Sequence, residues 1–179
     1  TRRQRQMCIR DRYENTRLAL KKFINASDES EIIFTKNSTE SLNLVASCYG
    51  SKFINEGDEI ISTELEHHAN FVPWHFLRKK KGAVIKFLEI DDKGNLKIED
   101  LEKLITKKTK IISLTHMSNV TGTIVDIKKV VEIAKIHNIP VCVDGTQGAA
   151  HLDVNLKDID CDFYAFSGHK MYGPTGAVS

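Results

Sequence analysis

The chain alternates between two patterns of apolar and polar residues. Some runs are apolar at nearly every position, which is typical of strands buried on both faces. These runs predict strands over residues 31–35, 58–63, 83–90, 109–116, 139–145 and 161–167. Between them, apolar residues recur three and four positions apart, which predicts helices over 11–26, 39–53, 70–80, 97–105 and 126–138. We therefore expect an α/β fold with a mostly parallel sheet and helices on both faces.

One predicted helix contains a proline. Pro73 lies within 70–80, and proline removes a backbone hydrogen bond. We expect that helix to be interrupted near Pro73.

Length and composition indicate one ordinary globular domain. The 179 residues can bury a core, and 41% are hydrophobic while 28% are charged. There is no apolar run of membrane-spanning length and no signal-peptide core, so no membrane partner is expected.

The basic residues are concentrated at the start. The net charge is +2, and five arginines fall within residues 1–12, "TRRQRQMCIRDR". The remainder is slightly acidic, so nucleic acid is not an expected partner. The opening fits neither a helix face nor a strand. We interpret residues 1–12 as a basic segment that is either foreign to the fold or a disordered tail.

The four cysteines are widely spaced, at Cys8, Cys48, Cys142 and Cys161, without a C-x-x-C pair. This spacing argues against a zinc ribbon or a disulfide framework and favours the reducing cytoplasm.

Polar groups follow the predicted strands. In open α/β sheets ligands bind beyond the carboxyl ends of the strands. We therefore expect one site formed by the residues 35–39, 64–70, 115–122, 144–147 and 167–170.

The first of these groups resembles an anion site. Asn37 can cap a helix and Glu40 can complete a capping box. The free N–H groups and hydroxyls of Ser38 and Thr39 then suit a phosphate. A helix start without a ligand explains the same residues.

Asp144 follows a buried strand, where a carboxylate requires a cation or hydrogen-bond donors. It could pair with a protonated ring nitrogen, and Gln147 one turn later could reach the same ligand. A helix cap and a Mg²⁺ ligand remain alternatives.

Two further candidates are weaker alone. The imidazole of His67 could stack on an aromatic ring, bind a metal or cap a helix, although no H-E-x-x-H motif is present. The Asn119 amide could donate to a ring oxygen, and Gly122 is expected to supply a turn.

Lys170 follows an apolar strand and stands beside His169. A free lysine has a pKa of about 10.4, and burial or nearby cations prepare Schiff-base lysines. Pyridoxal phosphate requires such a lysine, an acid for its ring nitrogen and a phosphate cradle. Lys170, Asp144 and the Ser38–Thr39 cap provide one of each.

With these residues, the chain resembles the class V aminotransferase family of fold-type I pyridoxal-phosphate enzymes. Within it, "EHHANFVPW" and "AFSGHKMYGPTG" resemble cysteine desulfurases of the SufS type, from about Tyr13 to Ser179. The resemblance implies that residues 13–179 belong to the large cofactor-binding domain, incomplete at both ends.

The resemblance also implies residue roles. Lys170 would hold the cofactor as a Schiff base, Asp144 would pair with the pyridinium, and His67 would stack on the ring and relay protons. Gln147 would bond the phenolic oxygen, with Asn119 nearby. The phosphate would be held by Ser38, Thr39, Ser167 and His169.

The implied activity is the conversion of L-cysteine to L-alanine, with sulfur passed to a protein persulfide for iron–sulfur cluster assembly. A homodimer and a sulfur-acceptor protein are the implied partners. The family carries its substrate-carboxylate arginine and sulfur-accepting cysteine in a later segment, so this sequence is expected to be an interior fragment. A selenocysteine lyase, an aminotransferase or an epimerase of the same family remains the alternative. A nucleotide- or sugar-phosphate-binding domain is disfavoured because no P-loop or G-x-G-x-x-G motif is present.

Overall fold

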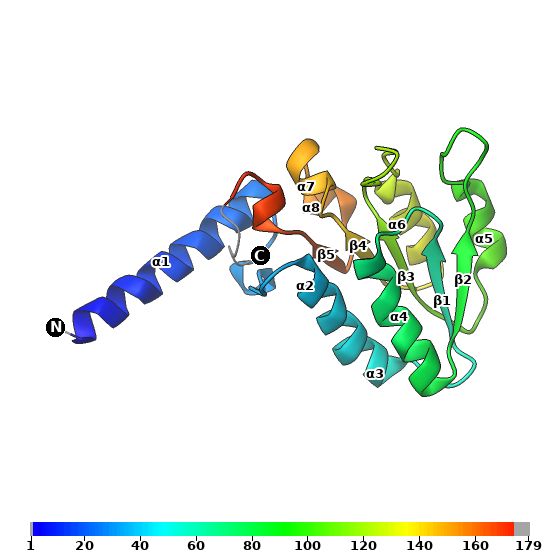
Figure 1. Ribbon diagram of the computed structural model, residues 1–179, viewed down its shortest axis with the longest axis horizontal. Helices are drawn as coiled ribbons and strands as arrows, with labels where there is room; N and C mark the ends of the chain where they lie inside the picture. The colour runs from blue at the N-terminus through cyan, green and yellow to red at the C-terminus, as the bar shows by residue number, and fades with distance from the viewer. Residues whose placement is uncertain (1, 174–179) are drawn as a thin grey trace.

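The protein contains a five-stranded parallel sheet. The computed structural model describes residues 2–173 (Figure 1). The strands are β1 (Glu59–Thr63), β2 (Val84–Leu88), β3 (Thr109–Thr115), β4 (Val141–Asp144) and β5 (Phe163–Ala165). Their order is β2-β1-β3-β4-β5, and each neighbouring pair is parallel. The predicted α/β class with a parallel sheet is therefore confirmed.

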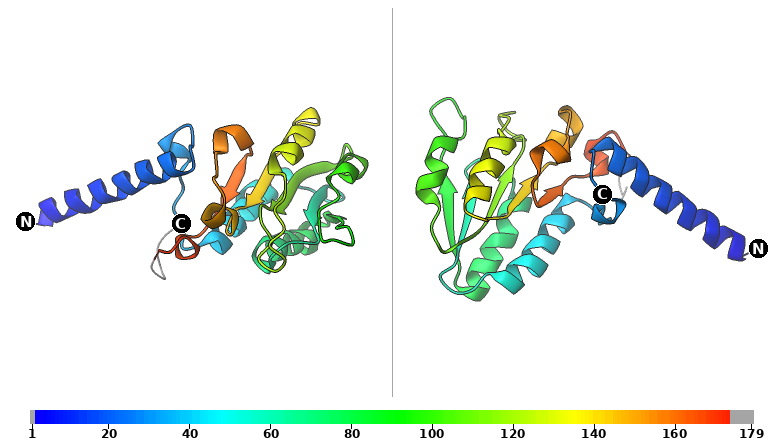
Figure 2. Two further views of the ribbon diagram at one scale, coloured as in Figure 1. Left: turned by 90° about the horizontal axis from the view of Figure 1, so that it is seen from above. Right: turned by 180° about the vertical axis from the view of Figure 1, so that it is seen from behind.

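Helices cover both faces of the sheet, as the view from above shows (Figure 2). One face is covered by α2 (Ser38–Val45), α3 (Ser51–Phe53) and α4 (His68–Lys81), the other by α5 (Leu101–Leu104) and α6 (Ile127–Ile136). Two short helices, α7 (Gly148–His151) and α8 (Leu156–Ile159), precede β5 and were not predicted.

Each face has its own hydrophobic core. The α2 and α4 side is centred on the fully buried Trp74 and Leu42. The α5 and α6 side is centred on Leu101 and Val130. Because successive strand residues point to opposite faces, Ile111 and Ile112 of β3 each belong to a different core. The continuous apolar runs in the sequence arise from this double burial.

Pro73 does not interrupt its helix. α4 runs from His68 to Lys81 with Pro73 inside it, which corrects the sequence prediction. Pro73 lies in the second turn, where only one backbone hydrogen bond is lost, and its buried ring packs inside the fold.

The run predicted as a strand over residues 31–35 forms no strand. A 3-10 turn, Glu29–Glu31, is followed by chain without regular structure. Ile32 and the partly buried Phe34 instead join a small core with Ile24 and Phe166. The residues are apolar because of this packing, and a short apolar run does not distinguish it from strand pairing.

The opening segment forms a helix, although its sequence matches no helix face. α1 runs without a break from Arg2 to Phe23 and projects away from the sheet (Figure 1). Residues 8–12 are solvent-exposed, so no apolar face is needed there. From its middle onward the helix contacts the body: the ring centroids of Tyr13 and Phe34 are 4.5 Å apart, and Arg17 stacks over both rings.

Within residues 2–173, no helix combines the length and the apolar character needed to cross a bilayer.

The four strands β1, β3, β4 and β5 end near one another on one side of the sheet. The loops that follow them, with the N-terminus of α2, form the candidate site.

Candidate active site

A cavity of about 190 Å³ lies beyond the carboxyl ends of the strands. All nine residues predicted for the site line it: Ser38, Thr39, His67, Asn119, Asp144, Gln147, Ser167, His169 and Lys170. The sequence analysis did not single out Ala69, Thr115, Met117 and Thr146 as site residues, and it named Asn37 only as a cap. The five polar groups that follow the predicted strands thus all contribute to one cavity.

The N-terminus of α2 faces this cavity with hydrogen-bond donors. The side chain of Asn37 accepts from Glu40 N at 2.9 Å, as predicted, but the Glu40 carboxylate reaches back to Lys36 N rather than to Asn37 N. Within residues 2–173, no partner is recorded for the N–H of Thr39. Such an N–H at a helix N-terminus is available to an anion.

Ser38 is held by a second serine from the far end of the chain. Ser38 N donates to Ser167 Oγ at 2.8 Å, and Ser167 Oγ donates to Ser38 Oγ at 3.0 Å. Both serines are buried. Since Ser38 Oγ accepts from Ser167, its own hydroxyl proton remains available to a ligand.

Asp144 is the last residue of β4 and is only 4% exposed. Its Oδ1 accepts from Thr146 N at 3.0 Å and from Thr146 Oγ1 at 2.5 Å. In the part of the chain that the structure describes, no hydrogen bond to Oδ2 is recorded. A buried carboxylate with one satisfied oxygen and one available oxygen suits a cationic or N–H ligand.

His67 is the N-cap of α4, and its Nδ1 accepts from Ala69 N at 3.1 Å. Because Nδ1 is an acceptor, the neutral imidazole carries its proton on Nε2. His68 does not line the cavity, and the two rings stand edge to face with centroids 6.3 Å apart.

Lys170 ends a 3-10 turn, Gly168–Lys170, that follows β5. Its N–H donates to Ser167 O at 3.0 Å, and its side chain is exposed where it borders the cavity. Gly173 N closes the turn on Gly168 O at 3.0 Å, at a place where a Cβ atom would approach that oxygen to 2.7 Å. The rest of the predicted turn, 174–176, lies outside the described residues.

The loop that carries Asn119 is closed by its own hydrogen bonds. Ser118 N donates to Thr123 O at 2.9 Å, and Gly122 has a φ of +72°, as expected for a turn glycine. Asn119 is solvent-exposed at the edge of the cavity.

A buried histidine–tyrosine pair supports the loop that carries Asp144 and Gln147. His116 Nδ1 lies 2.8 Å from Tyr164 Oη. Burial lowers the pKa of His116 and raises that of Tyr164, so the neutral forms of both rings are favoured in this hydrogen bond. A Cβ atom on Gly145 would lie 2.1 Å from the Tyr164 ring, and one on Gly148 would lie 2.7 Å from His116 Nδ1. The two glycines let this loop pack directly on both rings.

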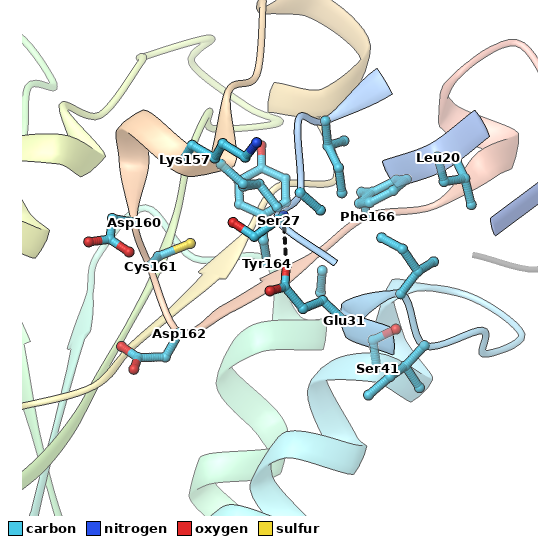
Figure 3. Close-up of a pocket in the computed structure, with 16 residues that line it drawn as sticks. Leu20, Ser27, Glu31, Ser41, Lys157, Asp160, Cys161, Asp162, Tyr164 and Phe166 are labelled. Atoms are coloured by element: carbon cyan, nitrogen blue, oxygen red, sulfur yellow. Dashed lines mark hydrogen bonds between the residues drawn. The ribbon is translucent and has the colours of Figure 1, made fainter. Parts of the chain in front are cut away.

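A second cavity, of about 460 Å³, lies between the C-terminal part of α1 and α8, and Tyr164 forms part of its lining (Figure 3). Its lining includes Glu31, whose carboxylate accepts from Ser27 N at 3.1 Å, and Cys161. The described residues that line it include none of the nine predicted site residues. It is larger than the first cavity but does not contain the predicted chemistry.

Within residues 2–173, no group of three histidine, cysteine or acidic side chains could hold a metal ion. The strand-end cavity instead combines a primary amine, a buried carboxylate, an imidazole and a helix N-terminus. This set suits a ligand with an anionic group, a basic ring nitrogen and an electrophilic carbon. The fold and cavity therefore define a class: a parallel α/β domain with a cavity at its strand ends that suits a small anionic ligand.

Comparison with known proteins identifies the family. The aminotransferase class-V family model matches residues 2–178, and the chain belongs to this family. The match begins inside the opening segment that the sequence analysis had separated from the family resemblance.

Individual relatives agree with this assignment. A probable cysteine desulfurase of Halalkalibacterium halodurans is 48% identical over 166 residues, which are 93% of this chain and 41% of the relative. The crystal structure of the cysteine desulfurase CsdA from Escherichia coli matches with a TM-score of 0.91 and 41% identity, over 96% of this chain and 43% of that one. The apo structure of a cysteine desulfurase from Thermococcus onnurineus NA1 matches with a TM-score of 0.87 and 44% identity, over 93% of this chain and 41% of that one. The chain thus spans about two fifths of the length of these relatives.

Proposed function

We propose that this chain is the cofactor-binding part of a pyridoxal-phosphate-dependent cysteine desulfurase of the SufS type. Its reaction would convert L-cysteine to L-alanine and pass sulfur to a protein persulfide for iron–sulfur cluster assembly. The observation that supports it is the meeting of Lys170, Asp144 and the N-terminus of α2 at one cavity. The names of the relatives support the choice of reaction. Residues 13–179 would belong to the large domain.

The donor set fits pyridoxal phosphate. Lys170 would hold the cofactor covalently, and the available oxygen of Asp144 would accept from the ring nitrogen. His67 would lie against the ring, Gln147 would bond the phenolic oxygen, and Asn119 would lie beside them. The phosphate would be bound by the donors of Ser38, Thr39, Ser167 and His169.

The cofactor, when bound, supplies an electron sink for negative charge at the α-carbon of the substrate. Asp144 would keep a proton on the ring nitrogen, which stabilises that charge. The freed amine of Lys170 would take the proton from the α-carbon. The Nε2–H of neutral His67 would act as a hydrogen-bond donor towards the ligand.

The sulfur acceptor would come from elsewhere. The described residues that line the cavity include no cysteine. Burial raises the pKa of Cys161 to about 12 and holds that of Cys142 well above its usual range, so neither thiol is a ready nucleophile. We propose that the accepting cysteine lies in another segment of the whole protein and passes its sulfur to an acceptor protein. The whole protein would be a homodimer. The four free thiols favour a cytoplasmic location.

Titration with pyridoxal phosphate tests the cofactor part of the proposal. The folded chain is expected to develop a yellow absorption band, which Lys170→Ala removes. Lys157→Ala is the matched control because Lys157 lines the other cavity, so this variant should keep the band. A folded chain that stays colourless, or a band that persists in Lys170→Ala, contradicts the proposal.

Product analysis separates the desulfurase from other class V reactions. In the whole protein, L-cysteine should yield alanine and persulfide sulfur. Selenocysteine turnover alone would indicate a lyase, keto-acid-dependent amino transfer an aminotransferase, and inversion of the α-carbon an epimerase.

A further inference from the structure

A half-buried glutamate outside the cavity connects three of the elements that surround it. Glu66 directly precedes His67, and its Oε1 accepts from Thr63 Oγ1 at 2.6 Å and from Thr115 N at 2.8 Å. Its Oε2 accepts from Asn70 Nδ2 at 2.6 Å. Thr63 ends β1, Thr115 ends β3, and Asn70 lies in the first turn of α4. One side chain therefore ties two strand ends and a helix start together.

The direction of the hydrogen bond between Asn70 and Glu66 is determined by a tryptophan. The indole N–H of Trp74 can only donate, and it lies 2.9 Å from Ser113 Oγ and 3.4 Å from Asn70 Oδ1. Ser113 Oγ donates to the same Oδ1 at 2.7 Å. The oxygen of the Asn70 amide must therefore face Trp74, so its NH₂ group must face Glu66.

The other two contacts of Glu66 are also donors. The backbone N–H of Thr115 can only donate. Thr63 Oγ1 accepts from Leu65 N at 3.1 Å, so its hydroxyl proton is directed to Glu66. Both oxygens of Glu66 are acceptors in all three contacts, which is the pattern of the ionised carboxylate that prevails above its raised pKa of about 7. Binding is therefore compared at pH 8.

This carboxylate acts on residues of the cavity. His67 follows it in the chain, Thr115 lines the cavity, and Thr115 pairs with Asp144 across β3 and β4. The negative charge of Asp144 is close enough to contribute to the raised pKa of Glu66, of which burial is the main cause. Glu66 thus joins the strand that precedes His67 to the strand that flanks Asp144.

We propose that Glu66 is a positioning residue of the cofactor site: its carboxylate holds His67 and Thr115 at the spacing that the ligand needs. This inference rests on the proposed function, because the ligand whose binding it affects is pyridoxal phosphate. Glu66 does not touch the ligand and acts through the residues that it holds.

Exchanging the amide and the carboxylate tests the hydrogen-bond pattern. In Glu66→Gln, the new NH₂ group must face either Asn70 Nδ2 or the Thr63 and Thr115 donors, so one donor meets another. We expect the dissociation constant of pyridoxal phosphate to rise about tenfold or more. The double variant Glu66→Gln with Asn70→Asp restores every donor–acceptor pair, because the new amide donates to the new carboxylate. Its affinity should return to within about threefold of wild type.

Glu64→Gln is the matched control. It removes the same charge from an exposed glutamate two positions earlier in the chain, whose carboxylate accepts from Ile90 N at 3.1 Å, and should leave the affinity unchanged. Circular dichroism without cofactor establishes that each full-chain variant folds, so affinity is compared among folded proteins.

The outcomes separate this inference from the proposed function. A folded wild type that binds no pyridoxal phosphate contradicts the proposed function itself. A wild type that binds it, with unchanged affinity in Glu66→Gln, overturns the positioning role. Equal loss in the single and double variants, or a double variant that does not fold, overturns the donor–acceptor pattern. If Glu66→Gln lowers the melting temperature but leaves the affinity for pyridoxal phosphate unchanged, Glu66 only stabilises the fold.

Discussion

At the scale of single residues, the cavity brings together side chains with different electrostatic environments. Lys170 is exposed at its edge, whereas Asp144 is buried and has one oxygen satisfied by Thr146. In the proposed function, Lys170 reacts with the ligand and Asp144 supplies an anion beside it. The two residues therefore give different predictions on substitution.

Replacing Asp144 by asparagine tests the fixed charge. Asp144→Asn keeps an oxygen for Thr146 N but loses the anion that we propose pairs with the ring nitrogen of the cofactor. We expect turnover of L-cysteine by the whole protein to fall roughly a hundredfold, as when one oriented electrostatic group is lost. Cofactor binding should persist because Lys170 and the phosphate donors remain. Steady-state kinetics of Asp144→Asn at wild-type rates would contradict this role.

Glu66 gives a prediction on pH and stability. Burial raises its pKa from 4.5 to about 7. Between these pH values the folded chain keeps a proton that the unfolded chain has lost, so this group's contribution to stability falls as pH rises through the window. The expected loss is about 3 kcal/mol. Urea denaturation from pH 4.5 to 7 measures the free energy of unfolding. That of wild type should fall more steeply with rising pH than that of Glu66→Gln. Parallel curves would refute it.

At the scale of elements, the ends of strands and helices carry the site. The N-cap of α2 faces the cavity, whereas the N-cap of α6, Asp126, accepts from Lys129 N at 3.1 Å and does not line it. The same local interaction thus occurs once at the site and once away from it. Comparing the two N-caps separates the effect of a lost cap on helix stability from its effect on ligand binding.

Substituting the two caps makes that separation. Asn37→Ala and Asp126→Ala should each lower the free energy of unfolding by about 1 kcal/mol. Only Asn37→Ala should weaken binding of pyridoxal phosphate, because it releases the turn that presents Ser38 and Thr39. Calorimetric titration of both variants checks this. Equal weakening in both would mean that the position of the cap is irrelevant to the ligand.

Elements also show where sequence patterns are sufficient. The buried runs of β3 and β4 predict strands because both faces require apolar residues. Ile32 and Phe34 form an equally apolar run, yet they pack on Phe166 without pairing. Pro73 suggests an interruption, but the continuing helix tolerates it near its start. A local pattern reports burial, and only tertiary contacts determine which element buries the residues.

The same limit applies to the site. The candidate residues after β1, β3, β4 and β5 could be predicted because parallel strands end at one edge. Ser38 and Thr39 follow a predicted strand that does not form, and they reach the cavity from the N-terminus of α2.

The Glu66, Asn70 and Trp74 network and the support of His116 and Tyr164 are not visible in the sequence. Glu66, Asn70 and Trp74 lie together in "EHHANFVPW", but their partners on other elements are up to 49 residues away, as for Glu66 and Thr115, and the motif does not reveal those contacts.

At the scale of the whole molecule, a parallel sheet gathers distant segments at one edge. Ser38 and Ser167 are 129 residues apart in the chain and share hydrogen bonds in the cavity. The chain belongs to the aminotransferase class-V family, and it spans about two fifths of the length of its relatives. The central claim is that this edge binds pyridoxal phosphate through Lys170.

Borohydride reduction followed by peptide mapping tests this claim most directly. Reduction fixes a pyridoxyl group on the lysine that holds the cofactor, and mass spectrometry identifies that residue. The account predicts one stoichiometric modification, at Lys170, that is absent from Lys170→Ala. A folded chain in which Lys170 stays unmodified, or in which label is scattered over other lysines, would contradict it.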